Sequence, residues 1–322
     1  MCQKKIILLS GKKFSGKDTV ADYLVLKYGY TKIAISSKIK DLLKLLFNFT
    51  DEQLNSNLKE VKDQFWRITP RKVLQFVGTE MFQFKIQELV PHIKRNFWIT
   101  AVIDMIRKTN IKKLVITDIR FKHEKIELNK IFNNKNNKIL SIKILRNYIF
   151  TSSNQNIKEK ENMLNNKFKK LNLNNSIMMN KAIKYKIKNI IKLLFNFTDK
   201  EINNNTRNLI WKITPKEASN FIHKELFEIK ILKLLPYLNK NFWIHSILSN
   251  NTKKKYISET KINDVKCFSK INNKYIKKIK ENHISETEVN DIKCSYKINN
   301  NYSLNKLYKN IELILDTSSF LL

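Results

Sequence analysis

The fold of this chain is decided by Gly11-Lys12-Lys13-Phe14-Ser15-Gly16-Lys17-Asp18-Thr19. An apolar run over residues 4–10 precedes this stretch and predicts a buried strand, and residues 20–26 after it predict a helix. A strand, a Gly-x4-Gly-Lys loop and a helix in that order are typical of a phosphate-binding loop. The chain contains four glycines in all, and two of them stand here at the required spacing. We therefore prefer this interpretation to its alternative, a chance match of two glycines and a lysine.

The chemistry of the loop points to ATP. Glycines allow backbone N–H groups to turn toward an anion, and the positive end of the following helix faces the same anion. A lysine at the position of Lys17 reaches the β- and γ-phosphates, and a hydroxyl beside it holds Mg²⁺. The residue directly after this lysine is Asp18, so the hydroxyl comes one position later, at Thr19. The candidate ATP-binding residues are Gly11, Phe14, Ser15, Gly16, Lys17, Asp18 and Thr19, with Thr19 also a candidate Mg²⁺ ligand.

Length and charge bound the class of the protein without deciding it. The 322 residues suffice for one large domain or two ordinary ones. Lysine and arginine number 62 against 28 acidic residues, which gives a net charge of +34 and would suit nucleic acid or an acidic surface. The basic excess is spread along the whole chain and is not gathered into one tail or helix. Nucleic-acid binding therefore stays the lesser alternative.

The apolar segments and the cysteines predict a cytoplasmic protein. No apolar segment approaches the length that spans a bilayer, so we expect no membrane partner. The first apolar run is a short strand that leads directly into the loop, and we expect no secretory leader. The three cysteines, Cys2, Cys267 and Cys294, have neither metal-ligand spacing nor the pattern of a disulfide framework. A reducing compartment is expected.

A second helix carries a candidate acceptor site. Thr69-Pro70 predicts a helix start, because proline is favoured at the first helical position. Arg71, Gln75 and Gly78 recur at i, i+4 and i+7, so they share one face of this helix. An arginine and an amide beside a glycine could hold a phosphorylated acceptor. The alternative is an ordinary solvated helix face.

A strand over residues 113–118 ends in Asp118, which downstream of a phosphate-binding loop is a candidate ligand of Mg²⁺ or of its water shell. Arg120 follows two residues later and would lie on the same side if the strand continues. It could meet the charge that develops on a transferred phosphoryl group. The alternative is an Asp–Arg pair of structural use alone. Further strands at 32–35 and 139–145, with a helix at 38–49, predict an α/β fold with a mainly parallel sheet covered on both faces.

Together these residues resemble the deoxynucleoside monophosphate kinases of phages and large DNA viruses. The resemblance covers about residues 1–146 and rests on the Ser-Gly-Lys-Asp-Thr core of the loop and on four further segments. Those segments are Ile35 to Lys40, Thr69 to Glu80, Trp98, and Asp118-Ile119-Arg120-Phe121 with Glu124. It implies an adenylate-kinase-like P-loop fold that moves the γ-phosphate of ATP to a deoxynucleoside monophosphate with Mg²⁺, in the host cytoplasm if the chain is viral.

From this resemblance we take Lys17, Asp118 and Arg120 as candidate catalytic residues, with Asp118 and Thr19 toward the metal. The candidate acceptor-binding residues are Lys40, Arg71, Gln75, Gly78, Thr79, Glu80 and Trp98. Phosphomevalonate kinases share a related loop, so a different acceptor is one alternative. A catalytically inactive nucleotide- or nucleic-acid-binding protein is another.

Residues 188–248 (the second copy) repeat residues 40–103 (the first copy). Lys44 to Asp51 returns as Lys192 to Asp199, Trp66 to Pro70 as Trp211 to Pro215, and Asn96 to Ile99 as Asn241 to Ile244. Identity at this level indicates an internal duplication. Thr50 with Gln53 has the form of a helix capping box, and the second copy keeps such caps as Thr198 with Glu201 and Thr214 with Glu217. However, Lys216, Asn220 and His223 stand where the first copy has Arg71, Gln75 and Gly78. We interpret the second copy as degenerate: it keeps what packs and loses what binds.

The chain therefore divides into four predicted parts. A kinase core occupies residues 1–150 and an Asn/Lys-rich linker residues 151–182, followed by the degenerate, mainly helical repeat at 183–250. Residues 251–322 contain a repeated Ile-Ser-Glu-Thr segment and a helix that resembles the one closing the kinase fold. The insertion displaces that helix by more than a hundred residues, which threatens activity. His283 could serve as a base, although we favour a capping or packing role.

Overall fold

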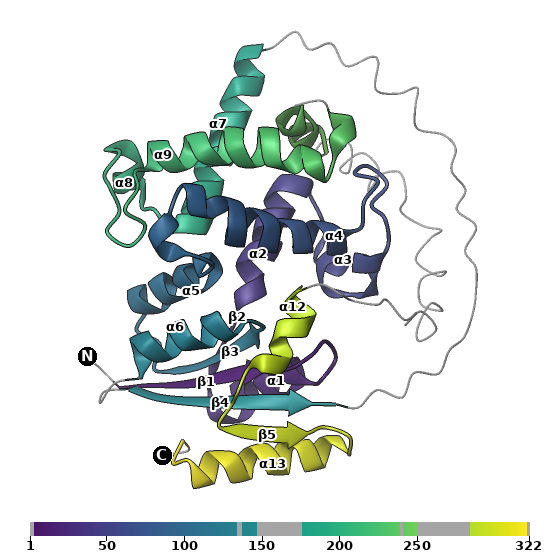
Figure 1. Ribbon diagram of the computed structural model, residues 1–322, viewed down its shortest axis with the longest axis vertical. Coiled ribbons are helices and arrows are strands. Elements are labelled where there is room, and N and C mark those ends of the chain that lie inside the picture. Colours follow the sequence, from purple (N-terminus) through teal and green to yellow (C-terminus); the bar gives the residue numbers. More distant parts are fainter. Residues whose placement is uncertain (1–2, 134–136, 147–175, 239–240, 250–283, 321–322) are drawn as a thin grey trace, which may run out of the picture.

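A five-stranded parallel sheet forms the centre of the molecule (Figure 1). The computed structural model describes residues 3–133, 137–146, 176–238, 241–249 and 284–320. The strand order is β2-β3-β1-β4-β5. The strands are β1 (Lys4–Ser10), β2 (Thr31–Ala34), β3 (Lys113–Ile119), β4 (Asn137–Leu145) and β5 (Tyr296–Asn299). Helices flank this sheet, so the predicted α/β fold class is confirmed.

The strand before the loop is buried on both of its faces. Ile6 and Leu8 belong to one apolar cluster, and Ile7 and Leu9 belong to a second cluster on the opposite side of the sheet. Successive side chains of a strand point to opposite faces, so a continuous apolar run is what a strand between two helical layers requires. The first cluster includes residues of α2 (Ile35–Phe47), α5 (Phe97–Lys108) and α6 (Lys122–Phe132). The second includes residues of α1 (Lys17–Tyr28) and α13 (Leu304–Thr317).

A helical arm extends from α2 away from the sheet. Its elements are α3 (Asp51–Asn55), η1 (Asn57–Glu60), α4 (Pro70–Gln75), η2 (Phe76–Phe84), η3 (Lys85–Glu88) and η4 (Pro91–Ile93). The capping box predicted at Thr50 is present, and the helix start predicted at Thr69-Pro70 is confirmed, with the Thr69 side chain accepting from the Lys72 N–H. The helix predicted at 38–49 begins earlier, at Ile35, because the strand before it already ends at Ala34. The segment η2 is a π-helix that continues α4.

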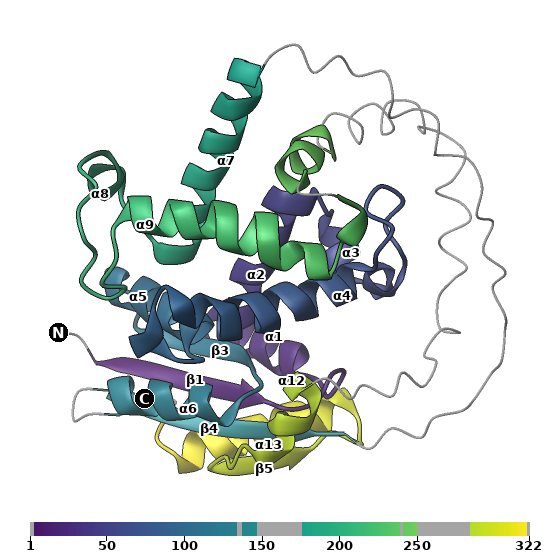
Figure 2. The ribbon, with the colours of Figure 1, turned by 45° about the horizontal axis from the view of Figure 1, so that its top comes forward.

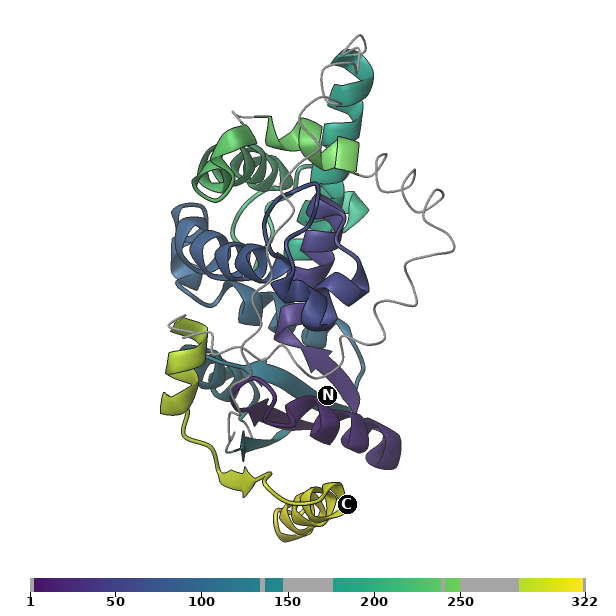
Figure 3. The same ribbon diagram turned by 90° about the vertical axis from the view of Figure 1, so that its right-hand side faces the viewer.

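The second copy forms a further helical layer on the side of the arm remote from the sheet (Figures 1 and 3). Its elements are α7 (Ser176–Phe195), α8 (Asp199–Asn203), α9 (Pro215–Asn220), η6 (Phe221–Ile229), η7 (Lys230–Lys233), η8 (Pro236–Leu238) and a helix over 242–249. Both predicted capping boxes are present, and η6 is a π-helix at the position equivalent to η2. Helix α7 begins inside the stretch predicted as linker, whose residues 151–175 lie outside the described part.

The C-terminal segment closes the sheet in spite of the inserted second copy. After α12 (Ile284–Thr287) and η9 (Glu288–Asp291), strand β5 pairs with β4 and α13 packs beside α1 (Figure 2). The Asn300 backbone N–H donates to the Leu145 carbonyl at 2.7 Å, which extends the pairing beyond β5. The closing helix expected from the sequence is therefore in place. His283 and the first Ile-Ser-Glu-Thr segment fall outside the described residues. None of the described helices combines the length and apolar character needed to cross a bilayer.

We expect the closing helix to be required for stability. Ile311 of α13 is fully buried in the cluster beneath β1, whereas Leu313, two residues later, is 63% exposed. Ile311→Ala should lower the free energy of unfolding by about 2–5 kcal/mol, because it leaves a cavity in a packed core. Leu313→Ala should change it by no more than about 0.5 kcal/mol. Urea unfolding of both variants measures this, and equal losses would contradict the assigned packing.

Candidate active site

The loop Gly11–Thr19 is shaped by its two glycines. Gly11 has φ +147°, and a Cβ there would lie 2.4 Å from the carbonyl oxygen of Ile144 in β4. Gly16 has φ +102°, and a Cβ there would lie 2.4 Å from the side-chain amide nitrogen of Asn300. A larger residue is excluded at both positions by backbone conformation and by space. Gly16 also caps α1 without a side-chain hydrogen bond, and the positive end of this helix faces the loop.

Two polar side chains inside the loop suit a bound phosphate. Lys17 is buried, and its ammonium donates to the Lys12 carbonyl oxygen at 2.8 Å. The hydroxyl of Ser15 is buried and has no hydrogen-bond partner among the described residues. A buried hydroxyl without a partner is costly, and it is expected where a ligand completes the site. The loop residues therefore fit the phosphates of ATP.

A bulge in β3 orients Asp118. The register with β1 runs from Leu8 opposite Ile116 to Ser10 opposite Ile119, so β3 carries one residue more than β1 over this stretch. Asp118 lies in this irregular stretch with φ +64°, a conformation uncommon for residues other than glycine. The strand ends at Ile119, so the condition under which Arg120 was expected beside Asp118, a continued strand, is not met. The bulge nevertheless brings the two side chains to 3.8 Å between the Arg120 guanidinium and the Asp118 carboxylate.

Asp118 is held as a carboxylate. Burial opposes its ionisation, but the charges of Arg120 and Lys17 and a 2.7 Å hydrogen bond from the Ser36 hydroxyl outweigh burial and hold the pKa of Asp118 below its usual range. An ionised carboxylate beside the loop suits Mg²⁺, a hard cation that takes one or two protein ligands together with phosphate oxygens and water. Thr19 reaches the same cavity. No cluster of three or more His, Cys, Asp or Glu that could hold a metal occurs in the described part of the chain.

Glu124 fixes the backbone that carries these two residues. Its carboxylate accepts from the backbone N–H groups of Arg120 at 2.9 Å and Phe121 at 3.1 Å. Burial raises the pKa of Glu124 to about 7, although both hydrogen bonds and the Arg120 charge act in the opposite direction. The side chain is 4% exposed and belongs to the wall of the cavity. Glu124 is thus a positioning residue for the turn between β3 and α6.

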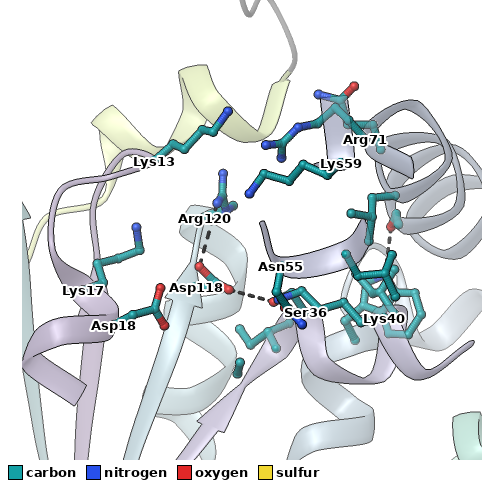
Figure 4. A pocket seen from close by; sticks show the side chains of 18 of the residues that line it. Lys13, Lys17, Asp18, Ser36, Lys40, Asn55, Lys59, Arg71, Asp118 and Arg120 are labelled. Carbon is teal, nitrogen blue, oxygen red and sulfur yellow. Dashed lines mark hydrogen bonds and ion pairs between the residues drawn. The ribbon is translucent and has the colours of Figure 1, made fainter. Parts of the chain in front are cut away.

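The loop, β3 and the helical arm enclose one cavity of about 730 Å³ (Figure 4). Lys17 and Asp118 stand on the sheet side, and Arg71 and Lys59 face them from the arm. Among the described lining residues, eight are basic and three are acidic. The basic residues are Lys13, Lys17, Lys32, Lys40, Lys59, Arg71, Arg120 and Arg146, and the acidic residues are Asp18, Asp118 and Glu124. Such a concentration of positive charge favours a polyanionic ligand.

An ion network joins the loop to the arm at the mouth of this cavity. One carboxylate oxygen of Glu60 accepts from Arg71 at 3.0 and 2.9 Å and from Lys13 at 3.2 Å. Lys59 lies beside these cations, and burial together with the charges of Arg71 and Lys13 lowers the pKa of Lys59 to about 8. Glu60 therefore orients two cations from opposite walls toward the space between them.

The residues predicted to share one helix face and hold the acceptor (the acceptor wall) do face the cavity. Arg71, Gln75 and Gly78 all line the cavity, although the α-helix changes to a π-helix between the second and the third. The indole N–H of Trp98 donates to the Gly78 carbonyl oxygen at 2.8 Å, so this tryptophan supports the wide turn as well as lining the cavity. The π-helix does not depend on the glycine, because η6 has the same form with His223 at the equivalent position.

Two comparisons with known proteins match parts of this chain. A family model described as deoxynucleotide monophosphate kinase matches residues 5–65. A protein of Acanthamoeba polyphaga mimivirus, named as a candidate deoxynucleotide monophosphate kinase, is 33% identical over 126 residues, or 37% of this chain. Over these stretches the chain is similar to deoxynucleotide monophosphate kinases. The match covers 65% of the mimivirus protein, which is less than two thirds of its length. This similarity favours a nucleotide kinase and, with it, a phosphotransferase.

Most residues predicted for the kinase site lie around the one cavity. Those that line it are Phe14, Gly16, Lys17, Asp18, Thr19, Lys40, Arg71, Gln75, Gly78, Thr79, Trp98, Asp118 and Arg120. Gly11 and Ser15 are buried within the loop and do not line the cavity. Glu80 is not part of the wall: its carboxylate lies 3.6 Å from Lys230 of the second copy. This placement does not support Glu80 as an acceptor-binding residue.

Several lining residues were not proposed from the sequence. They include Lys13, Ser36, Asn55, Lys59, Gln83 and Arg146. Ser36 lies within the family-like segment at 35–40, so that segment offered a signal for it. Lys59 offered none, because lysine is abundant throughout the chain. Lys40 was proposed from the sequence. It donates to the Asn55 side-chain oxygen at 2.7 Å, and this contact identifies Asn55 as part of the site only once the fold is known.

The second copy has a blocked version of the acceptor wall. The ring of His223 stacks on Trp243 at 5.5 Å and 11°, where Gly78 in the kinase core leaves its Trp98 facing the cavity. The indole N–H of Trp243 donates to the His223 carbonyl oxygen, as Trp98 does to Gly78. The packing contact is thus kept while the open space is filled, as expected of a copy that retained its fold and lost its site.

We expect Glu124 to make stability fall with rising pH. The folded state raises its pKa from 4.5 to about 7, so the folded protein binds this proton more tightly and loses stability as pH rises through that window. Glu124→Gln keeps an acceptor for both N–H groups and cannot ionise. Urea unfolding from pH 4.5 to 8 should show a loss in the wild type that exceeds the variant's by on the order of 3 kcal/mol. Parallel pH profiles would contradict this assignment.

We expect Lys59 to titrate near pH 8, with charged neighbours that shift its pKa in opposite directions. Competitive acylation of amines, followed by peptide mass spectrometry across pH, measures the half-reaction point of this lysine in the whole protein. Glu60→Gln should shift that point below the wild-type value, because a nearby negative charge is lost, and Arg71→Gln should shift it above, because a positive charge is lost. A half-reaction point near the ordinary lysine pKa of about 10.4, or shifts of the opposite sign, would contradict the cationic cluster.

Proposed function

We propose that this protein transfers the γ-phosphoryl group of ATP to a deoxynucleoside monophosphate, producing the diphosphate for deoxynucleotide supply. The observation that carries the proposal is a cavity in which the loop Gly11–Thr19 faces the Arg71 wall across a basic interior. Two phosphorylated substrates that meet in line need such an arrangement, because both bring negative charge to one point. The similarity to deoxynucleotide monophosphate kinases supports the same conclusion.

The loop wall suits ATP. The positive end of α1 favours an anion, the buried Ser15 hydroxyl can donate a hydrogen bond to a phosphate, and Lys17 supplies a charge from the same side. To contact a phosphate, the Lys17 ammonium must leave the Lys12 carbonyl oxygen. The exchange is favourable because a charged phosphate oxygen is the stronger acceptor. Bound Mg²⁺, held by the Thr19 hydroxyl and the Asp118 carboxylate, would neutralise charge on the phosphates.

The opposite wall suits a monophosphate. The Arg71 guanidinium, oriented by Glu60, can pair with two oxygens of a phosphate, which a lysine cannot do. Gln75, Thr79 and Gln83 add polar groups along the same helix, and Trp98 adds an aromatic wall. These groups hold the acceptor while one of its phosphate oxygens attacks the γ-phosphorus and the bond to the β–γ bridging oxygen breaks.

Arg120 stands between the two walls. Its guanidinium is anchored beside Asp118 and by the Glu124-capped turn, so it is positioned before any substrate arrives. A preorganised cation at the transferred group stabilises the charge on its equatorial oxygens and pays no reorganisation energy during the reaction. The catalysis proposed here is therefore positioning and electrostatic stabilisation, without a covalent intermediate on the protein.

Lys17→Ala is expected to lower kcat/KM for a deoxynucleoside monophosphate by about 10²-fold or more, the usual effect of removing one charge-stabilising donor. Lys12→Ala is the matched control: Lys12 belongs to the same loop but is exposed and does not line the cavity. ADP formation with ATP and Mg²⁺ is measured with each deoxynucleoside monophosphate, CMP, UMP and phosphomevalonate in turn.

Three results would contradict the proposal. ADP formation with phosphomevalonate alone would place the enzyme in another acceptor class. No turnover with any acceptor would indicate an inactive nucleotide-binding protein. Retention on DNA at high salt would favour a nucleic-acid-binding role, because association driven only by an incidental basic surface weakens steeply as salt rises.

A further inference from the structure

The two copies contact each other through ion pairs that repeat when the copies are exchanged. Lys85 of the first copy lies 3.3 Å from Glu225 of the second. Lys230, the residue equivalent to Lys85, lies 3.6 Å from Glu80, the residue equivalent to Glu225. Each of these lysines also lies over an aromatic ring of the other copy, at 6.0 and 5.9 Å. The rings belong to Phe221 and Phe76, which are again equivalent residues.

The buried centre of the interface has the same reciprocity. A phenylalanine from each copy inserts between an aromatic pair of the other, at ring distances of 5.0–5.8 Å. The contacts are Phe97 with Phe195 and Trp211, and Phe242 with Phe47 and Trp66. All six side chains are fully buried. Equivalent helices also meet, since α2 packs against α7.

A third set of contacts joins side chains to backbone. His92 lies 3.1 Å from the carbonyl oxygen of Ile210, and Tyr237, the equivalent of His92, donates its hydroxyl to the carbonyl oxygen of Trp66. Ile210 directly precedes Trp211, the equivalent of Trp66, so the two contacts differ by a single position along the chain. Ion pairs, aromatic insertions and backbone contacts thus all relate the copies by the same exchange.

Exchange symmetry of this kind defines an isologous interface, in which one surface patch is used by both partners of a two-fold dimer. We infer that the second copy is a built-in partner subunit: it takes, within one chain, the place that a second copy of the acceptor arm would take across a two-fold axis. This accounts for its pattern of change. The ion-pair and aromatic residues of the interface are kept, such as Phe242 and Lys230, whereas the binding positions equivalent to Arg71 and Gly78 are altered.

The built-in partner braces the acceptor helix, a role that rests on the proposed function. Gln75, Gly78 and Thr79 face the cavity, while Phe76 and Glu80 of the same continuous helix contact Lys230. The π-helix therefore has its substrate face on one side and the second copy on the other. Movement of the second copy would displace the acceptor wall and leave the ATP loop, which is built on the sheet, in place.

Charge reversal in the full chain tests the inference. Lys230→Glu and Glu80→Lys should each lower the urea midpoint of unfolding, and the double reversal should restore it, since opposite charges again face each other. Lys85→Glu with Glu225→Lys should show coupling of the same sign and similar size. Lys85 also pairs with Glu88, and comparing the double variant with both single variants cancels the loss of that pair. Lys224→Glu, at an exposed neighbouring position, is the matched control, and it should show no coupling to Glu80→Lys.

Kinetics test the bracing separately. Lys230→Glu should raise the KM for the deoxynucleoside monophosphate about threefold, the scale of one exposed ion pair, leave the KM for ATP unchanged, and be rescued by the double reversal. Coupling in one pair and none in the other would overturn the built-in partner, and equal changes in both KM values would overturn the bracing. Should the wild type phosphorylate no deoxynucleoside monophosphate, the proposed function fails and the unfolding cycles alone decide the inference.

Discussion

The site depends on one constraint: β3, β1 and β4 are adjacent and parallel, so their carboxyl ends meet at one edge of the sheet. The loop leaves that edge after β1, Asp118 lies at the end of β3, and the carbonyl oxygen of Ile144 near the end of β4 leaves no space for a side chain at Gly11. In a parallel sheet covered on both faces, this edge is where polar groups can gather without being buried by helices. The cationic cavity opens there.

The cations that line the cavity also need negatively charged partners, and the chain supplies too few to neutralise them all. Glu60 pairs with Arg71 and Lys13, and Asp118 is ionised beside Arg120. Lys59 remains among positive neighbours with a pKa lowered to about 8. Like charges held together this way cost stability. That cost is offset when a polyanion binds, which is how a cavity of this kind gains affinity for phosphate.

The acceptor arm has two faces with different tasks, and the second copy makes that division possible. An amphipathic arm projecting from a sheet must bury its outer apolar face against something. Here Phe97, Trp66 and Phe47 are covered by the second copy. Because the second copy covers only the outer face, the opposite face of the arm remains open toward the loop. The degeneration of the second copy is consistent with a structural task that needs its aromatic residues and not its former binding positions.

Local patterns predicted much of this molecule. The two-glycine loop between an apolar strand and a helix, the capping boxes at Thr50, Thr198 and Thr214, and the alternation of strands and helices all depend on neighbouring residues, and the structure contains each of them. The face shared by Arg71, Gln75 and Gly78 follows from helical spacing and lines the cavity.

Other features depend on residues far apart in the sequence. The conformation of Asp118 depends on a bulge, and a bulge depends on the register with β1, which no pattern within β3 encodes. Glu80 was predicted to face the acceptor and instead meets Lys230, 150 positions later. The contact of Asn300 with the loop exists only because β5 pairs with β4 across the insertion. The sequence by itself determined the loop, the helix caps and the fold class, because these are local. Tertiary structure alone decided which side of each element faces the cavity and which faces the second copy, because contacts between distant segments make that choice.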